Sequence, residues 1–281
     1  MIGARRVVAS TLFIFVAVYL GIMVLVWAFQ SRLLYFPARG LVGTPAAMGM
    51  AYTDVRFQAS DGVRLHGWYI PAGEQAPAGE RGTVLFFHGN GGNISGWLSA
   101  IVPFRELGFD TFLIDYRGYG ESQGEPSEMG TYRDAEAAWR YLTEDRAIAA
   151  DRIVLVGRSL GGAVATWLAE RHPPRALILE STFTSVPDLA SELYPWLPVR
   201  LLVRFRYDTA SRLPRVDAPV LIVHSRTDEI IPFHHGQRLF EAARPRRAFL
   251  EVQGGHNDGF IPAFHLYEEG VRRFLETHAP R

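Results

Sequence analysis

The residues best suited to chemistry in this chain form a short Gly-x-Ser-x-Gly sequence, Gly157-Arg158-Ser159-Leu160-Gly161. An apolar run at residues 153–156 precedes it and predicts a buried strand, while residues 163–170 predict a helix. In such a strand-turn-helix context the turn exposes the serine hydroxyl, and the helix N-terminus directs free N–H groups at the site. The sequence therefore predicts a nucleophilic serine. An ordinary strand-to-helix loop is the alternative interpretation.

A serine hydroxyl becomes a nucleophile only when a base takes its proton and a third group orients that base. Among the histidines after Ser159, only His256 directly follows the last predicted strand, and two glycines before it allow the backbone to bend back over the serine. Asp228 follows the predicted strand 220–224 and is the candidate acid. Glu180, which follows the preceding strand, is the rival acid.

Hydrolysis through a serine also requires two N–H donors for the oxyanion of the tetrahedral intermediate. The residue after the nucleophile, Leu160, is expected to supply one. The second is expected from Asn90, in the glycine-rich segment 88–93 that follows a predicted apolar strand. A phosphate-binding turn is the alternative, but this segment lacks the G-x-G-x-x-G spacing that such turns use.

Together these residues resemble the α/β-hydrolase superfamily, from about Tyr52 to the C-terminus. The segments that carry the resemblance are His88-Gly89-Asn90, Asp115-Tyr116-Arg117-Gly118-Tyr119-Gly120-Glu121-Ser122, the Gly-x-Ser-x-Gly sequence, Asp228 and His256. The uncharged N-terminal run, with segments 180–185 and 194–198, is similar to single-pass α/β-hydrolase-domain proteins often labelled serine-aminopeptidase-like. That resemblance implies thioesterase or lysophospholipid lipase activity. The sequence departs from the aminopeptidase label, because no acidic pocket for a substrate amine is evident.

The order of predicted elements indicates an α/β fold with a mostly parallel, doubly wound sheet. A predicted hairpin comes first, and strands then alternate with helices. The predicted strands are 53–58, 63–70, 83–88, 109–115, 153–156, 175–179, 220–224 and 248–252, and the predicted helices are 94–107, 133–142, 163–170, 237–243 and 264–278.

The N-terminal region predicts a membrane anchor. Residues 7–29 carry no charge, and a spanning helix needs about 20 residues. A cleavable signal peptide is the alternative, but its apolar core is usually only about 7–15 residues long. We expect a transmembrane anchor at residues 1–30, a linker at 31–50 and an α/β-hydrolase domain at 51–281.

Residues 182–213 interrupt the alternation of strands and helices with apolar and aromatic residues between prolines. We expect a short cap over the active site, with an apolar underside suited to an acyl chain. Helices that merely pack on the domain are the alternative interpretation, and the two are compatible.

The composition excludes several functions. The 281 residues have zero formal net charge, no cysteine and no lysine, all basic residues being arginine. Thiol catalysis, Cys-ligated metals, lysine Schiff bases and Walker-type phosphate loops are therefore excluded. We expect no metal, no cofactor and no nucleic-acid partner, and the sequence does not indicate the oligomeric state.

These features predict a membrane-anchored serine hydrolase that cleaves carboxylic esters or thioesters through Ser159, His256 and Asp228. A serine peptidase or amidase with the same residues is the alternative, and a catalytically silent binding protein is a further one. Arg5 and Arg6 precede the span, and this bias favours a single-pass protein of the bacterial inner membrane with its catalytic domain outside the cytoplasm.

Overall fold

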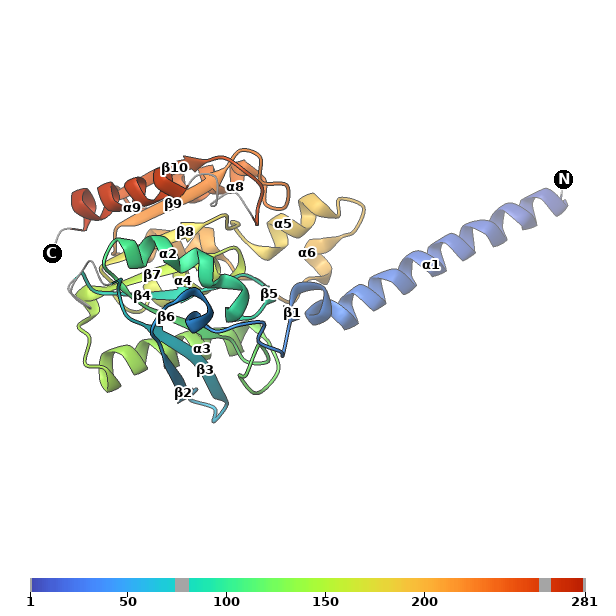
Figure 1. Ribbon diagram of the computed structural model, residues 1–281. Coiled ribbons are helices and arrows are strands. Elements are labelled where there is room, and N and C mark those ends of the chain that lie inside the picture. The colour runs from blue at the N-terminus through green and yellow to red at the C-terminus, as the bar shows by residue number, and fades with distance from the viewer. Residues whose placement is uncertain (1, 74–80, 258–263, 280–281) are drawn as a thin grey trace.

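The computed structural model describes residues 2–73, 81–257 and 264–279, and its centre is an eight-stranded twisted sheet (Figure 1). The strand order is β10-β9-β8-β7-β4-β6-β3-β2. Strand β3 runs antiparallel to both of its neighbours, β2 and β6, and all other neighbouring pairs in this sheet are parallel. The strands are β2 (Thr53–Gln58), β3 (Arg64–Ile70), β4 (Thr83–Phe87), β6 (Asp110–Asp115), β7 (Ile153–Arg158), β8 (Ala176–Glu180), β9 (Val220–Ser225) and β10 (Arg247–Val252).

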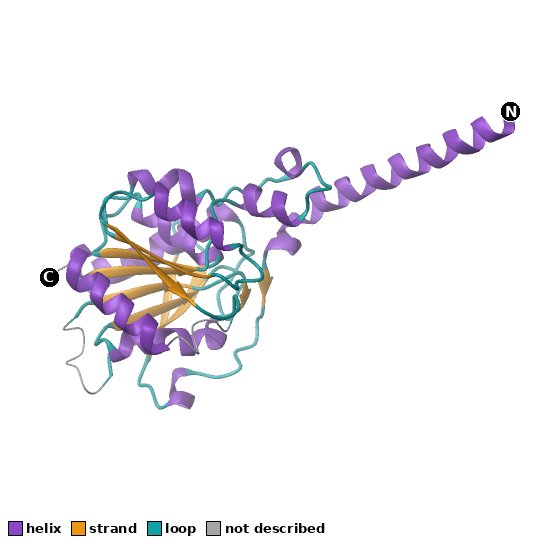
Figure 2. Ribbon diagram, turned by 90° about the horizontal axis from the view of Figure 1, so that it is seen from above, coloured by secondary structure: helices purple, strands orange, loops and turns teal. Residues whose placement is uncertain are grey.

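Helices cover both faces of the sheet (Figure 2). The central strands are apolar over most of their length because alternate side chains point to opposite faces and both faces are buried. In β4, Leu85 and Phe87 pack toward one set of helices, whereas Val84 and Phe86 pack toward the other. The first set is α3 (Glu128–Arg140), α4 (Leu160–Ala169) and α8 (Phe233–Ala242), and the second is α2 (Leu98–Glu106) and α9 (Phe264–His278).

The predicted α/β fold and its mostly parallel sheet are confirmed, and the main differences lie at helix ends. Helix α3 begins five residues earlier than predicted. The reason is local, because the Ser127 side chain caps the helix by accepting the N–H of Gly130 at 3.1 Å. The predicted helix 94–107 begins as a 3₁₀ turn at Ile94–Trp97 before α2.

Residues 31–50, which the sequence predicts to be a linker, lie against the domain. The two-residue strand β1 (Phe36–Pro37) pairs with β5 (Gly91–Gly92), and a 3₁₀ turn follows at Pro45–Met48. Tyr35 and Met50 are both buried. This segment therefore runs beside the glycine-rich loop that follows β4.

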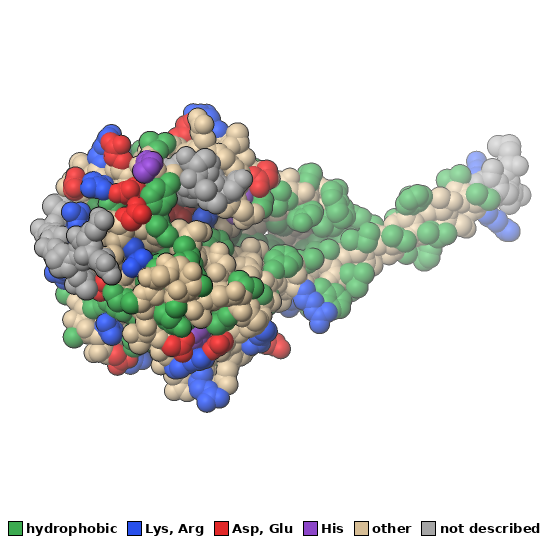
Figure 3. Space-filling model, in the orientation of Figure 1, with side chains coloured by type: hydrophobic (Ala, Val, Ile, Leu, Met, Phe, Trp, Pro, Cys, Tyr) green, Lys and Arg blue, Asp and Glu red, His purple; other side chains and the backbone are tan. Residues whose placement is uncertain are grey.

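Helix α1 (Ile2–Leu34) projects from the domain, and its surface is largely apolar (Figures 1 and 3). Its segment Arg5–Leu34 is long and apolar enough to cross a membrane, and an N-terminal signal sequence would have the same character. The backbone leaves helical geometry at Phe29, the last residue before the polar Gln30 and Ser31, so α1 kinks next to the domain.

Three short helices, α5 (Val186–Leu193), α6 (Val199–Leu202) and α7 (Thr209–Arg212), follow β8 and form the region expected to be a cap. Helix α6 contacts the base of α1. The C-terminal end of α1 and the region expected to be a cap therefore form adjoining parts of one surface.

We expect the side chain of Phe86 to contribute strongly to stability. It is fully buried at the centre of the sheet, so F86A should lower the free energy of unfolding by about 3–5 kcal/mol. Denaturant titration of the full chain in detergent measures this loss. The matched control M129A, at a side chain that is 56% exposed, should change stability by no more than about 0.5 kcal/mol. Equal stability of the two variants would contradict this account of the core.

Candidate active site

Ser159 occupies the sharp turn between β7 and α4 in a strained backbone conformation. Its φ is 54° and its ψ is −120°. Residues other than glycine adopt this backbone conformation at a cost of about 1–3 kcal/mol. The N–H of Ser159 donates to the carbonyl of Glu180 at 2.9 Å, and the carbonyl of Ser159 accepts the hydroxyl of Thr182 at 2.7 Å. Bonds on both sides of the residue therefore hold the serine at the crest of the turn.

Two glycines permit this turn because the backbone segments around it nearly touch. A β-carbon at residue 161 would lie 2.0 Å from the carbonyl oxygen of Phe87. A β-carbon at residue 157 would lie 2.3 Å from the carbonyl oxygen of Gly161. Any side chain at either position would push α4 away from the sheet. The Gly-x-Ser-x-Gly spacing is thus required by packing.

Asp228 and His256, far apart in sequence, form a buried hydrogen-bonded pair. The Nδ1 atom of His256 lies 2.8 Å from Oδ2 and 3.1 Å from Oδ1 of Asp228. Oδ1 also accepts the N–H groups of Ile230 at 3.0 Å and Ile231 at 2.8 Å. The carboxylate therefore orients the imidazole so that its Nε2 is left for other partners.

The environment of Asp228 favours its charged form. Burial alone would raise the pKa of this carboxyl, but the hydrogen bond and positive charge of His256, with the two loop N–H groups, lower its pKa below the usual value. Asp228 is therefore ionised at neutral pH and can stabilise a positive charge on the imidazole.

The two expected oxyanion donors are near Ser159. Leu160 begins α4, and the Asn90 side chain donates to the Leu34 carbonyl at 2.8 Å. The carbonyl of Asn90 accepts the hydroxyl of Tyr119 at 2.8 Å, which fixes the loop. In the part of the chain that the structure describes, no acceptor is present for the backbone N–H of either Asn90 or Leu160. Within the described chain, neither N–H group is therefore engaged by another group.

Ser159, His256, Asn90 and Leu160 line one cavity of about 670 Å³. Its walls are mostly apolar, and its volume is in the range of about 300–1,000 Å³ that is typical of ligand pockets. Other lining residues include Val26, Gln30 and Leu33 of α1, Phe183, Leu189, Leu197 and Leu202 of the region expected to be a cap, Trp97 before α2, and Ile230 and Ile231 after β9.

The sequence and structure are similar to known proteins with this fold. The sequence profile described as alpha/beta hydrolase fold matches residues 82–204. The Mycobacterium tuberculosis protein Rv2307c is 39% identical over 262 residues, covering 92% of each chain. The alpha/beta hydrolase domain-containing protein WAV2 of Arabidopsis thaliana is 36% identical over 285 residues, covering 92% of this chain and 91% of WAV2. This chain belongs to the α/β-hydrolase family. The structure of esterase Pf2001 of Pyrococcus furiosus shares the fold, with a TM-score of 0.71, 18% identity and coverage of 88% of this hydrolase and 98% of the esterase.

Glu180, the rival acid of the hydrolase, faces a different group. Its buried carboxylate accepts the hydroxyl of Tyr267 and lies near the positive charge of Arg158. Burial raises the pKa of Glu180, although both of these neighbours oppose the rise. The imidazole of His256 bonds to Asp228 instead. The geometry therefore favours Asp228 over Glu180 as the partner of the histidine.

Two residues that the sequence analysis did not single out hold the His256 loop of the hydrolase. Arg158 donates to the carbonyl of His256 at 2.9 Å, and Glu229 accepts the N–H of His256 at 2.9 Å. Of the two, only Arg158 could have been noticed in the sequence, because a charged residue at the end of a buried strand must find acceptors nearby. Nothing in the sequence separates Glu229 from other exposed acids.

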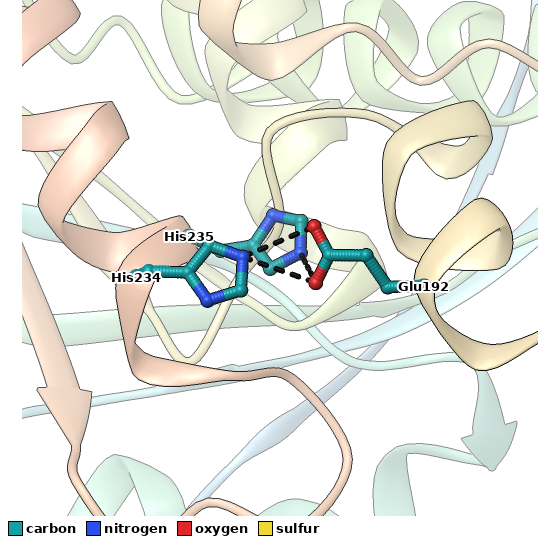
Figure 4. Close-up of side chains that lie close together, drawn as sticks. All are labelled: Glu192, His234 and His235. Carbon is teal, nitrogen blue, oxygen red and sulfur yellow. Dashed lines mark hydrogen bonds and ion pairs between the residues drawn. The ribbon is translucent and has the colours of Figure 1, made fainter.

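Glu192 of α5 lies beside His234 and His235 of α8 (Figure 4). His234 Nε2 is 3.0 Å from the carboxylate, and His235 Nε2 is 3.5 Å from it. The spacing of these three groups is similar to that of a metal site. However, Nδ1 of His235 already accepts the N–H of Thr184 at 3.2 Å. A neutral imidazole has one acceptor nitrogen, so Nε2 carries the proton and is no metal ligand. The cluster therefore links α5 to α8.

Substitution of the two acids separates their roles in the hydrolase. D228N should lower kcat for a p-nitrophenyl ester by about 10⁴-fold, because an amide favours the wrong tautomer of His256. E180Q should lose less than about tenfold, because Glu180 does not touch the imidazole. Steady-state kinetics on both purified variants measure the difference. A larger loss in E180Q than in D228N would transfer the role to Glu180.

Proposed function

We propose that this chain is a membrane-anchored serine hydrolase of carboxylic esters or thioesters. The observation that carries the proposal is the convergence of a strained serine and an Asp-bound histidine on the wall of one apolar cavity. Backbone strain and buried charge both lower stability, and no structural role of these residues would offset that loss.

The proposed reaction begins at Ser159. His256 removes the proton from the serine hydroxyl as its oxygen attacks the substrate carbonyl, and Asp228 stabilises the resulting imidazolium. The N–H groups of Leu160 and Asn90 bind the oxyanion. The imidazolium then protonates the leaving group, which departs as an alcohol or thiol. A water molecule, deprotonated by His256, releases the acyl group as a carboxylic acid and regenerates the serine.

The cavity supports an acyl substrate. Most of its lining is aliphatic or aromatic, and the described lining residues include no aspartate or glutamate. An aminopeptidase needs an acid to bind the ammonium group of its substrate, so this lining favours esters over peptides. The structure named an esterase from Pyrococcus furiosus has the same fold, which agrees with the proposal.

The apolar helix supports the proposed anchor. Its apolar segment exceeds the length that a bilayer requires, and the helix remains attached through contacts with the region expected to be a cap. Arg5 and Arg6 precede the apolar run, so we assign the N-terminus to the cytoplasm and the catalytic domain to the other side. Under this proposal the fold includes a cap at residues 182–213.

S159A tests the nucleophile. It should lower kcat for p-nitrophenyl esters by about 10⁶-fold and abolish labelling by a fluorophosphonate probe, because no other group would attack the carbonyl. The control S211A alters an exposed serine of α7 and should retain both properties. Retention of esterase activity in S159A would reject the proposal.

A panel of substrates tests the class of bond. We expect kcat/KM for p-nitrophenyl esters to rise with acyl chain length, because longer chains bury more apolar area in the cavity. Aminoacyl p-nitroanilides should react far more slowly, since the described lining offers no carboxylate to their amine. Faster cleavage of the anilides would favour the peptidase alternative.

A further inference from the structure

One wall of the active-site cavity is made by helix α1. Val26, Gln30 and Leu33 line the cavity together with Leu197 and Leu202. Gln30 fixes this arrangement, because its side-chain N–H group donates to the carbonyl of Leu202 at 2.8 Å and its carbonyl oxygen accepts the N–H of Arg204 at 2.8 Å. The cavity is therefore bounded on one side by the proposed membrane anchor.

A second contact fixes the depth of the cap along this helix. The hydroxyl of Tyr19 donates to the carbonyl of Trp196 at 2.9 Å. Tyr19 lies ten residues before Phe29, where the apolar run ends, and thus about 15 Å along the helix axis from that end. A bilayer has a hydrocarbon core of about 30 Å, so in a spanning helix Trp196 lies near the middle of the bilayer.

The side chains at this level suit hydrocarbon. We call residues 193–203 the cap tip; its only charged residue is Arg200, which pairs with Asp188 at 2.8 Å. Trp196 is 55% exposed and Leu201 is 86% exposed, although both are large and apolar. Figure 3 shows apolar surface on the part of the domain next to α1 and on α1 itself. Exposed apolar residues gathered beside a spanning helix mark a membrane surface.

A polar boundary lies on the domain side of this surface. The guanidinium of Arg204 lies 4.9 Å from the ring centroid of Trp27. Tryptophan and arginine are enriched where the hydrocarbon meets the headgroups, since each has an apolar body and a polar end. Trp27 is eight residues from Tyr19, so this pair lies about 12 Å along the helix from the level of Trp196.

We propose that the cap tip lies in the bilayer and that the cavity between it and α1 admits a single-chain acyl ester directly from the leaflet. This inference rests on the proposed function. The acyl chain moves sideways between α1 and the cap tip without crossing water, and its ester group reaches Ser159 at the inner end of the cavity. The substrate class is therefore a bilayer-resident monoacyl ester rather than a water-soluble one.

Fluorescence quenching tests the depth. The full chain is reconstituted in phosphatidylcholine vesicles whose acyl chains carry bromine at a shallow or a deep carbon. Wild type and W196F are compared, so that their difference reports Trp196 alone. We expect this difference to be quenched by bromine, most strongly at the deeper carbon. The control W167F removes a tryptophan of α4, and its difference from wild type should not respond to bromine. No bromine effect on the Trp196 difference would overturn the proposal.

Vesicle kinetics test the route. L201D introduces a charge at an exposed position of the cap tip, outside the cavity lining, and L266D does so on α9, which lies away from α1 (Figure 1). We expect L201D to hydrolyse a palmitoyl monoester embedded in vesicles at least tenfold more slowly than wild type. Its rate on soluble p-nitrophenyl butyrate should stay within twofold, and L266D should match wild type on both substrates.

The two measurements separate the possible failures. If L201D hydrolyses the embedded ester at the wild-type rate, the cap tip is not the entrance. If wild type hydrolyses neither substrate, the proposed function fails, and the quenching of Trp196 still decides whether the cap tip lies in the bilayer. If L201D loses both activities equally, the effect is on folding or catalysis and the lateral route is rejected.

Discussion

The close approach of helix α4 to the ends of strands β4 and β7 is the constraint on which the rest of the site depends. A β-carbon at residue 161 would lie only 2.0 Å from the Phe87 carbonyl oxygen. Helix α4 therefore begins immediately beside the ends of these strands. The chain must then turn within a single residue, and Ser159 adopts a strained backbone conformation with a positive φ. This approach also brings the first N–H of α4 beside the loop after β4. The positions of the proposed nucleophile and of the expected oxyanion donors are thus consequences of one packing contact.

A second feature that shapes the site is the pairing of its two buried carboxylates, one with an imidazole and the other with an arginine. Asp228 faces the imidazole of His256, and hydrogen bonding outweighs burial so that its pKa falls. Glu180 lies near Arg158, yet burial outweighs that attraction and its pKa rises. Arg158 in turn holds the carbonyl of His256 at 2.9 Å. The histidine is therefore fixed at its ring by one acid and at its backbone by an arginine from the nucleophile turn itself.

The sequence predicted the features that depend on local patterns of residues, such as the strands. It did not predict the features that depend on single contacts between residues distant in the chain. Apolar runs predicted the strands, and the residues after those strands made Ser159, Asp228 and His256 the candidate site, since parallel strands bring their carboxyl ends to one edge. The packing of residues 31–50 on the domain was not predicted, because its prolines and glycines are equally typical of a free linker. The contact between Gln30 and Leu202 joins residues 172 positions apart, and no periodicity reports such a pair.

Gln30 shows why the proposed anchor and the cap are better regarded as one unit. The segment that joins α6 to α7 is irregular, so its backbone groups lack the partners that a helix or sheet would supply. The side-chain amide of Gln30 satisfies the carbonyl of Leu202, at the end of α6, and the N–H of Arg204, in the joining segment. Removing α1 would leave both groups unpaired and one wall of the cavity missing. The helix therefore contributes to the shape of the site as well as to attachment, which accounts for a polar residue directly after a long uncharged run.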